Sequence, residues 1–263
     1  MTHPWFAATA RPRVLAHRGL VTPDAAAHGV AENSFAAVAE AHGTGATYVE
    51  SDCHLTADGV VVLFHDEDLS RVAGDPRRLV DVSEAELEDL MADRGGLITL
   101  RQALDAFPTV RFNLDVKVTD AAAPVGEIIA PHADRVLVTS FSDSRRRAAL
   151  DAAKDAGGTV PATSAGTATI ARLLAALAVR SDRLVARALR GVDALQIPER
   201  QGALRVVTPR LIDAAHRHGV EVHVWTVNDP ADMRRLIDAG VDGVVTDRAD
   251  TALKVVEERS QPG

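Results

Sequence analysis

Short runs of apolar, β-branched residues alternate along the chain with alanine-rich segments whose apolar positions recur at helical spacing. That alternation is typical of parallel strands covered by helices. The apolar runs predict nine strands, at residues 13–17, 48–54, 60–65, 110–118, 136–141, 158–162, 194–197, 221–227 and 243–246. Helices are predicted at residues 34–42, 83–91, 100–106, 144–156, 168–178, 209–218 and 230–239, several of them between a capping Ser, Thr or Asp and a closing Gly.

Nine strands are one more than an eight-stranded barrel needs, and the stretch LTADGVV accounts for the extra one. An Asp-Gly pair between two alternating apolar runs predicts a two-residue hairpin turn, so the strand at 60–65 returns antiparallel to its predecessor. We therefore predict an α/β fold, a (β/α)₈ TIM barrel over residues 1–263, with a β-hairpin after the second strand. The charged stretch at 67–98 is predicted to be a small insertion or connection.

The composition narrows the functional classes. A formal net charge of −8 argues against a nucleic-acid or anionic-membrane surface, because both need a basic patch, whereas a small anionic substrate needs only local cations. A single cysteine, Cys53, excludes an intramolecular disulfide and favours a reducing compartment. With no apolar run of membrane-spanning length, we expect a cytoplasmic protein without stable membrane insertion, and the residues specify no oligomeric state.

One strand carries an unusual set of titratable groups. Side chains alternate along a strand, so Glu50, Asp52 and His54 share one face. Two carboxylates on one face repel each other unless a cation lies between them. If the Asp-Gly pair forms a two-residue turn, His65 on the returning strand lies directly opposite Asp52, with the Cβ atoms about 5 Å apart. We therefore expect an imidazole beside the carboxylate pair.

Two further strands end in polar groups. The first, in LAHRG, ends in His17 and Arg18, and the strand RFNLDVKV carries Asp115 and Lys117 two residues apart. A lone histidine in a strand is usually a satisfied core residue, and a lone carboxylate pair is usually a solvated strand end. Three such strand ends converge here, however, and the carboxyl end of the strands is where barrels hold their active sites.

Together, the motifs match a known family. LAHRG, ENS, GATYVESDCHLTADGVVVLFHD and NLDVK resemble, in order, the HRG, PENT, E-x-D with T-x-DG and HD, and N-x-E-x-K pattern of the glycerophosphodiester phosphodiesterase family. The resemblance continues through VHVWTVND and GVDGVVTDRAD, so it spans nearly the whole chain. It implies a phosphoric diester hydrolase that converts a small-molecule glycerophosphodiester to glycerol 3-phosphate and an alcohol.

The resemblance also implies roles for the matching positions. Glu50, Asp52 and Asp115 would hold one divalent cation, and oxygen ligands alone suit Mg²⁺ or Ca²⁺. Asp115 departs from the family, which usually has a longer Glu there. His17 and His65 would form the general acid/base pair, with no indication of which is the acid.

The remaining implied positions surround this centre. Arg18 and Lys117 would bind the oxygens of the substrate phosphate. Supporting or pocket-lining positions are Glu32 and Asn33 near the first histidine, Gln196 at a strand end and Trp225 as a pocket wall. His54 is a further candidate for the metal site by strand alternation only.

Several alternatives share these residues. The same site could belong to a lysophospholipase D-type phosphodiesterase or to a lyase that stops at a cyclic phosphate. A different class is a barrel that binds a phosphorylated metabolite without turnover. The presence of both His17 and His65 argues against that class, because binding alone needs no acid/base pair. A purely structural barrel is the least favoured interpretation.

Overall fold

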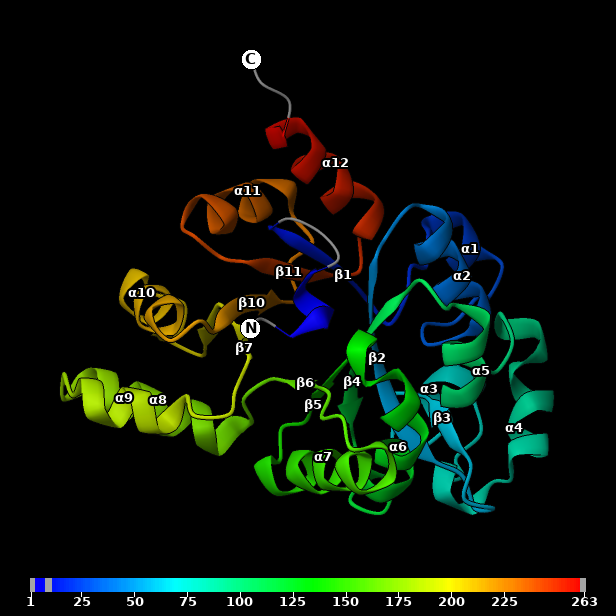
Figure 1. Cartoon of the computed structure of the whole chain (residues 1–263). Coiled ribbons are helices and arrows are strands. Elements are labelled where there is room, and N and C mark those ends of the chain that lie inside the picture. The colour runs from blue at the N-terminus through cyan, green and yellow to red at the C-terminus, as the bar shows by residue number, and fades with distance from the viewer. Residues whose placement is uncertain (1–2, 8–10, 261–263) are drawn as a thin grey trace.

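The apolar runs of the sequence form the strands of one sheet in the computed structural model, which describes residues 3–7 and 11–260. Eight strands run parallel, each beside the preceding barrel strand, and the last pairs with the first. A parallel bridge between Ser164 and Ala194 joins the remaining seam. The predicted (β/α)₈ barrel is confirmed (Figure 1). Its strands are β1 (Arg13–His17), β2 (Tyr48–Leu55), β4 (Arg111–Val116), β5 (Val136–Thr139), β6 (Ala162–Thr163), β7 (Ala194–Pro198), β10 (Glu221–Trp225) and β11 (Gly243–Thr246).

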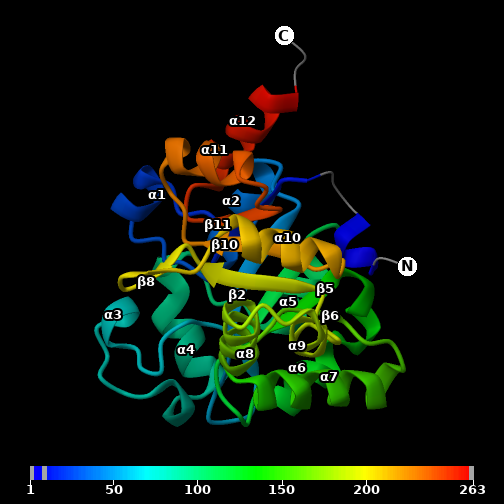
Figure 2. The same cartoon turned by 90° about the vertical axis from the view of Figure 1, so that its left-hand side faces the viewer.

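Helices surround the strands (Figures 1 and 2). The seven predicted helices are present as α2 (Phe35–Gly43), α4 (Glu84–Met91), α5 (Leu100–Ala106), α7 (Asp143–Gly157), α8 (Thr167–Ala178), α10 (Pro209–Arg217) and α11 (Pro230–Asp238). Helices that the sequence pattern did not predict are α1 (Pro23–Ala27), α3 (Ser70–Ala73), α6 (Ala122–Ile129), α9 (Asp182–Ala188), α12 (Ala249–Ser260) and the short 3₁₀ turns η1 (Pro4–Ala7), η2 (Leu79–Asp81), η3 (Ala92–Arg94) and η4 (Ala130–Arg135). In the described part of the chain, no helix combines the length and apolar character needed to cross a membrane.

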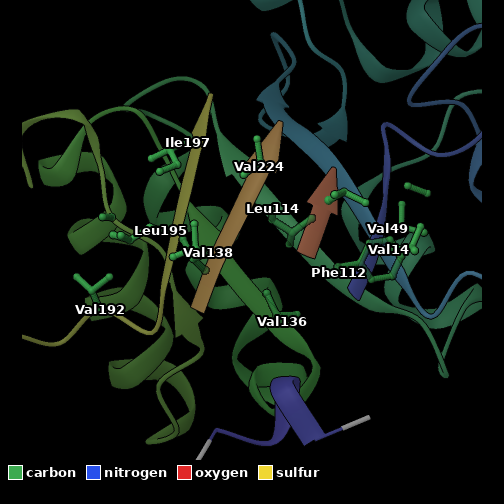
Figure 3. Packing of buried hydrophobic residues seen from close by; sticks show 14 of the residues in the cluster. Val14, Val49, Phe112, Leu114, Val136, Val138, Val192, Leu195, Ile197 and Val224 are labelled. Atoms are coloured by element: carbon green, nitrogen blue, oxygen red, sulfur yellow. The ribbon is translucent and has the colours of Figure 1, made fainter. Parts of the chain in front are cut away.

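Strand alternation divides the core into two layers. Outward-facing residues such as Val14, Val49 and Phe112 pack against the helices (Figure 3). Inward-facing residues such as Leu15 and Tyr48 fill the barrel interior, where they form a separate cluster. The same alternation turns the polar residues at the strand ends toward the barrel axis.

The N-terminal end of the barrel is closed by η1. Trp5 and Phe6 are buried in the interior cluster, and Trp5 Nε1 donates to the carbonyl of Phe112 at 3.0 Å. Beneath them, Arg13 forms a buried two-point ion pair with Glu221, at 2.8 and 2.9 Å. The barrel is therefore closed at this end, and a site for a ligand must lie at the opposite end.

The predicted hairpin is present, but its predicted register is wrong. β3 (Val61–Leu63) runs antiparallel to β2, as expected. The residue opposite Asp52 is Phe64 and not His65, and the Phe64 amide donates to the Asp52 carbonyl at 2.9 Å. A shift of one residue exchanges the two faces of a strand. His65 follows the end of β3, so strand alternation does not fix its direction.

The shift arises because the hairpin loop has three residues instead of two. Thr56 N donates to the Val60 carbonyl at 3.0 Å, leaving Ala57, Asp58 and Gly59 in the loop. The Thr56 hydroxyl fixes this longer loop, since it donates to Asp58 at 2.6 Å and accepts from Val60 N at 3.0 Å. Gly59 has a φ of 81°, the left-handed conformation that a three-residue loop of this kind requires.

The predicted strand at 158–162 is also wrong for most of its length. Gly158 instead ends α7 in a left-handed conformation, with a φ of 74°. Strand pairing begins only at Ala162. Residues 67–98 hold α3, η2, α4 and η3, and their apolar residues pack on Val62 and Phe64 of the hairpin. This connection therefore lies beside the barrel and shares a small core with β3.

Candidate active site

A cavity of about 570 Å³ opens at the carboxyl end of the barrel strands. This volume is typical of a small-molecule site. Nine of the eleven residues predicted for the site line it: His17, Arg18, Glu50, Asp52, His65, Asp115, Lys117, Gln196 and Trp225. Residues that are up to 208 positions apart in the sequence thus share one pocket.

The strand register brings the chemically important groups together. His17 on β1 is the direct partner of Glu50 on β2. Asp52 on β2 is the direct partner of Asp115 on β4. Neighbouring strands lie about 4.8 Å apart, so each pair of inward-facing side chains is within contact range. The sequence pattern correctly predicted which of these side chains share the inner face of a strand. The parallel register shows which of them lie side by side on neighbouring strands.

Three buried carboxylates lie close to two cationic side chains. Lys117 Nζ lies 2.8 Å from Asp52 Oδ1 and 2.8 Å from Asp115 Oδ2, and Arg18 Nε lies 3.1 Å from Asp52 Oδ2. Burial favours a raised pKa for Asp52, but Lys117 and Arg18 outweigh it and lower that pKa. Burial raises the pKa of Asp115 despite the nearby ammonium group. Burial and the Asp52 charge raise the pKa of Glu50 to about 8.

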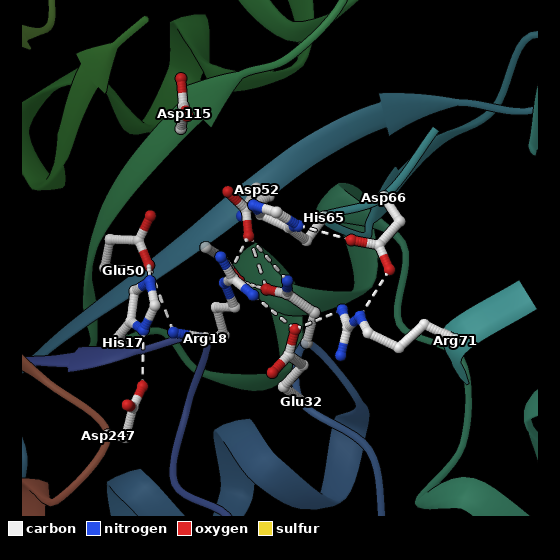
Figure 4. Close-up of polar contacts among 12 residues, drawn as sticks. His17, Arg18, Glu32, Glu50, Asp52, His65, Asp66, Arg71, Asp115 and Asp247 are labelled. Atoms are coloured by element: carbon white, nitrogen blue, oxygen red, sulfur yellow. Dashed lines mark hydrogen bonds and ion pairs between the residues drawn. The ribbon is translucent and has the colours of Figure 1, made fainter. Parts of the chain in front are cut away.

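His17 is held between two carboxylates (Figure 4). Its Nδ1 lies 2.6 Å from Asp247 Oδ1, and its Nε2 lies 3.8 Å from Glu50 Oε2. Asn228 donates to the other oxygen of Asp247 at 2.7 Å and so fixes that carboxylate. Burial favours a lower pKa for His17, but the bond to Asp247 and the charge of Glu50 outweigh it and raise that pKa.

His65 has a similar arrangement. Its Nδ1 lies 2.6 Å from Asp66 Oδ1, and Arg71 Nε donates to Asp66 Oδ2 at 2.7 Å. The same guanidinium reaches Glu32 Oε1 at 2.7 Å (Figure 4). Each of the two imidazoles in the cavity is therefore oriented through Nδ1 by an aspartate, which is itself held by a second side chain.

Glu32 and Asn33 lie behind this cavity and support its residues. The side chain of Asn33 donates from Nδ2 to Asp52 Oδ2 at 2.9 Å. The backbone N–H of Asn33 donates to the Arg18 carbonyl, also at 2.9 Å. Glu32 accepts from Arg18 Nη1 at 2.5 Å. These contacts tie the segment after β1 to the carboxylate on β2. The position of the cationic Arg18 is fixed by the same pair of residues.

The last two predicted residues differ in surroundings. Gln196 accepts from Asn113 Nδ2 at 3.3 Å, so its amide is partly engaged within the barrel. Trp225 packs edge to face with Phe141, with ring centroids 6.0 Å apart. His54, considered for the metal site, lies outside the residues that line the cavity. Burial lowers its pKa to about 4, and among the described residues its Nδ1 has no hydrogen-bond partner.

Sequence reasoning missed the residues that orient the two histidines. Asp66 follows His65 directly in the HD pair, so a signal for it was present. Asp247 follows β11, and β11 is the neighbour of β1 only because the barrel closes. Closure of the predicted barrel would have indicated that the TDRAD stretch lies beside the strand that carries His17.

The carboxylates supply a set of oxygen donors of the kind that binds a hard cation. In residues 3–7 and 11–260, no three His, Cys, Asp or Glu side chains are gathered tightly enough to form a preassembled metal site. The donor chemistry nevertheless fits a hard divalent ion, because Glu50, Asp52 and Asp115 are all buried and supply only oxygen. Asp115 Oδ1 is buried without a hydrogen-bond partner among the described residues, so it is available as a ligand.

Comparison with known sequences places the chain in a family. The model of the glycerophosphoryl diester phosphodiesterase family matches residues 17–251. A relative from Mycobacterium tuberculosis, named probable glycerophosphodiester phosphodiesterase 2, is 35% identical over 94% of this chain and 91% of its own length. A glycerophosphodiester phosphodiesterase from Caldanaerobacter subterraneus is 27% identical over 93% of this chain and 98% of its own.

Solved structures of similar proteins have the same fold. A glycerophosphodiester phosphodiesterase from Thermotoga maritima superposes with a TM-score of 0.68 at 26% identity, covering 94% of this chain and 99% of its own. An Oleispira antarctica phosphodiesterase, solved in complex with the product sn-glycerol-3-phosphate, gives a TM-score of 0.70 at 22% identity, with coverage of 94% and 97%. The resemblance expected from the motifs is confirmed, and the chain belongs to the glycerophosphoryl diester phosphodiesterase family of phosphoric diester hydrolases.

Proposed function

We propose that the chain hydrolyses glycerophosphodiesters to glycerol 3-phosphate and an alcohol in the cavity at the carboxyl end of the barrel. The observation that carries the proposal is that two aspartate-oriented histidines, three buried carboxylates and two cationic side chains line one pocket. The product bound in the Oleispira antarctica relative supports the assignment of this substrate class. We further propose that the reaction requires one divalent cation, Mg²⁺ or Ca²⁺.

His17 and His65 act as the acid/base pair. Each bonds an aspartate through Nδ1, so Nε2 is the nitrogen that exchanges a proton with the substrate. One imidazole removes a proton from the attacking hydroxyl, and the other gives a proton to the departing alkoxide. The roles require opposite protonation states, so one imidazole begins the reaction neutral and the other begins it protonated.

The charge of the substrate phosphate is matched by the other residues of the pocket. Arg18 and Lys117 are positioned to bind the phosphate oxygens, and both are neutralised in part by the carboxylates. Glu50, Asp52 and Asp115 would hold the divalent cation. When bound, this ion supplies positive charge near the oxygens on which negative charge develops.

A product assay tests the proposal. The full-length protein is incubated with a panel of glycerophosphodiesters, with chelator or with added Mg²⁺ or Ca²⁺, and the products are identified by phosphorus NMR. We expect glycerol 3-phosphate, formed only when divalent cation is present. Accumulation of a cyclic phosphate would identify a lyase, and binding without turnover would identify a binding barrel.

Substitution of the two histidines tests their roles. His17→Ala and His65→Ala are each expected to lower kcat by roughly 10²–10⁴-fold, because each removes one proton-transfer step. Circular dichroism controls for folding. Asp66→Asn and Asp247→Asn are expected to cause smaller losses, because both imidazoles are still present to transfer protons. Activity that survives both histidine substitutions would contradict the two-histidine scheme.

A further inference from the structure

The lining of the cavity is divided sharply by chemistry. Every ionisable side chain of the described lining comes from residues 17–117, on or after β1, β2, β3 and β4. The lining contributed by residues 139–245 contains no ionisable side chain among those described. Large apolar residues predominate on that side. We call them the apolar wall: Phe141, Ile170, Leu174, Leu204 and Trp225.

Helix α8 gives the first evidence that the apolar wall faces a ligand. A helix on the outside of a barrel normally needs one apolar face, which packs against the strands. In α8 that face contains the buried Leu173 and Leu177. Ile170, Ala171 and Leu174 form a second apolar face at helical spacing, and all three line the cavity. This second face is only partly covered by the protein.

Two residues of the apolar wall that lie outside α8 are unusually exposed. Leu204 lies on β9 (Leu204–Arg205), which pairs with β8 (Arg200–Gln201) in a small hairpin, and is 58% exposed. Phe141, which follows β5, is 60% exposed. Both line the cavity. Figure 2 shows the β8 hairpin and α8 on the side of the molecule that faces the viewer. Exposed large apolar residues gathered around a cavity indicate a ligand-binding surface.

A cationic head group such as choline fits this wall poorly. Phe141 and Trp225 offer two aromatic rings, and such rings attract cations. However, Lys117 Nζ already lies 5.8 Å from the centre of the Phe141 ring and would repel a second cation. The apolar wall also lacks a carboxylate among its described residues to balance such a charge. An uncharged aliphatic group meets neither difficulty.

We propose that the apolar wall binds an aliphatic chain carried by the substrate, so that the enzyme prefers chain-bearing glycerophosphodiesters to those with small polar or cationic alcohols. The proposal rests on the proposed function, because the phosphate must lie at the ionisable end of the same cavity. The chain can be attached to the glycerol, as in a lysophospholipid, or to the leaving alcohol. Both sources present the same chemistry to Ile170, Leu174 and Leu204.

Two homologous substrate series distinguish these sources. One series carries acyl chains of two to eight carbons on the glycerol of glycerophosphocholine, and the other carries n-alkanols of the same lengths as the leaving alcohol. All are used below micelle-forming concentrations. We expect kcat/KM to rise by about fourfold per methylene over the first carbons in one series, which identifies where the chain is attached. No rise in either series, while the substrates are still hydrolysed, would overturn the apolar-wall proposal alone. Failure of all substrates to react would overturn the proposed function as well.

A matched pair of variants tests the location of the chain. Leu204→Ser removes an exposed leucine of the apolar wall, and it is expected to reduce the rise in kcat/KM per methylene. Leu184→Ser is the control, since Leu184 on α9 is 46% exposed but does not line the cavity. The control is expected to keep the full chain-length dependence. Equal chain-length dependence in both variants and the parent would place the chain elsewhere and overturn the proposal.

A third comparison tests the charge argument. Glycerophosphocholine is compared with the diester of 3,3-dimethylbutanol, which has the shape of choline without its charge. The proposal expects the diester with the uncharged alcohol to have the same or a higher kcat/KM. A preference for choline of tenfold or more would show that Phe141 and Trp225 bind a cation, and it would overturn the aliphatic assignment.

Discussion

Both ends of the barrel hold buried charges, but the balance of positive and negative charge differs between the two ends. At the N-terminal end a buried anion is fully matched by cations: Arg13 bonds both oxygens of Glu221 and also reaches the Tyr48 hydroxyl at 2.7 Å, and Arg11 Nε lies 3.9 Å from Glu221 Oε1. His223 lies 3.1 Å from the same carboxylate. At the carboxyl end three buried carboxylates share Lys117 and Arg18.

The difference separates charges that hold the fold from charges that serve a site. Trp5 and Phe6 cover the ion pair at the N-terminal end. Burial favours a raised pKa for Glu221, but its bonds to Arg13 and His223 outweigh burial and lower that pKa to about 2. The opposite end is open to a cavity and has an excess of negative charge. Burial, together with the charge of Asp52, raises the pKa of Glu50 there to about 8. Incomplete neutralisation of buried groups beside a cavity is typical of binding and catalytic sites.

The largest expected effects come from matched isosteric substitutions, which should lower stability at the N-terminal end and activity at the carboxyl end. Glu221→Gln leaves Arg13 buried without its anion, so we expect a loss of about 3–5 kcal/mol of unfolding free energy while the folded protein keeps its kcat. Asp52→Asn should lower kcat by roughly 10³-fold with a smaller change in stability, because Lys117 keeps Asp115 and Arg18 keeps Glu32 as an anionic partner. Denaturant unfolding and steady-state kinetics on both variants measure this. A larger stability loss in Asp52→Asn than in Glu221→Gln would contradict the comparison.

The stability gained from metal binding should depend only on residues at the carboxyl end of the barrel. Divalent cation at about 100 times its dissociation constant is expected to raise the unfolding free energy of the parent by about 2.7 kcal/mol relative to protein in chelator. Glu221→Gln should show the same increase, because its charge lies at the far end of the barrel. Asp52→Asn should show little or none. Thermal unfolding with and without Mg²⁺ or Ca²⁺ measures the increments, and an undiminished increment in Asp52→Asn would exclude that carboxylate from the metal site.

The pH dependence of stability should have opposite signs at the two ends. Glu221 has a depressed pKa, about 2 against an ordinary 4.5, so its contribution is present above pH 4.5 and is lost as the pH falls toward 2. Glu50 has a raised pKa, about 8 against 4.5, so its folded form favours the proton and stability is lost as the pH rises from 4.5 to 8. Unfolding curves in chelator for the parent, Glu221→Gln and Glu50→Gln measure this. Glu50→Gln should flatten the loss between pH 4.5 and 8, whereas an unchanged slope would reject the raised pKa.

The sequence predicted the barrel well because its signals are local. Alternation, helix caps and closing glycines act within a few residues, and they also gave the faces of Glu50, Asp52 and Asp115 correctly. Helix α6 escaped prediction because it contains Pro124 and Gly126, both poor helix formers. The reason for Gly126 is tertiary, since a Cβ there would lie 2.3 Å from the Ala149 carbonyl oxygen of α7.

The parts of the site that sequence reasoning missed depend on the hydrogen bonds of a single side chain or on closure of the barrel by pairing of its last and first strands. The hairpin register is set by the Thr56 hydroxyl, which stabilises three loop residues where Asp-Gly alone indicated two. His65 therefore reaches the cavity from a loop and not from the strand position expected for it. Asp247 meets His17 across 230 residues, a contact that exists only after β11 and β1 have paired.

Substitution at the contact between Asp247 and His17 has the smallest expected effect. It tests whether a carboxylate sets the pKa of the imidazole at the carboxyl end. Asp247→Asn keeps the shape of the contact but removes its charge, so we expect kcat to fall by about tenfold and the pKa of His17 to fall with it. The limb of the pH–rate profile that reports His17 should then move to lower pH at saturating metal. Asp250→Asn, three residues further along and bonded to Arg248 on the surface, is the matched control and should leave the profile in place. A structural role for Asp247 alone would lower activity without moving the limb, and the contact would then position the loop after β11, not the imidazole.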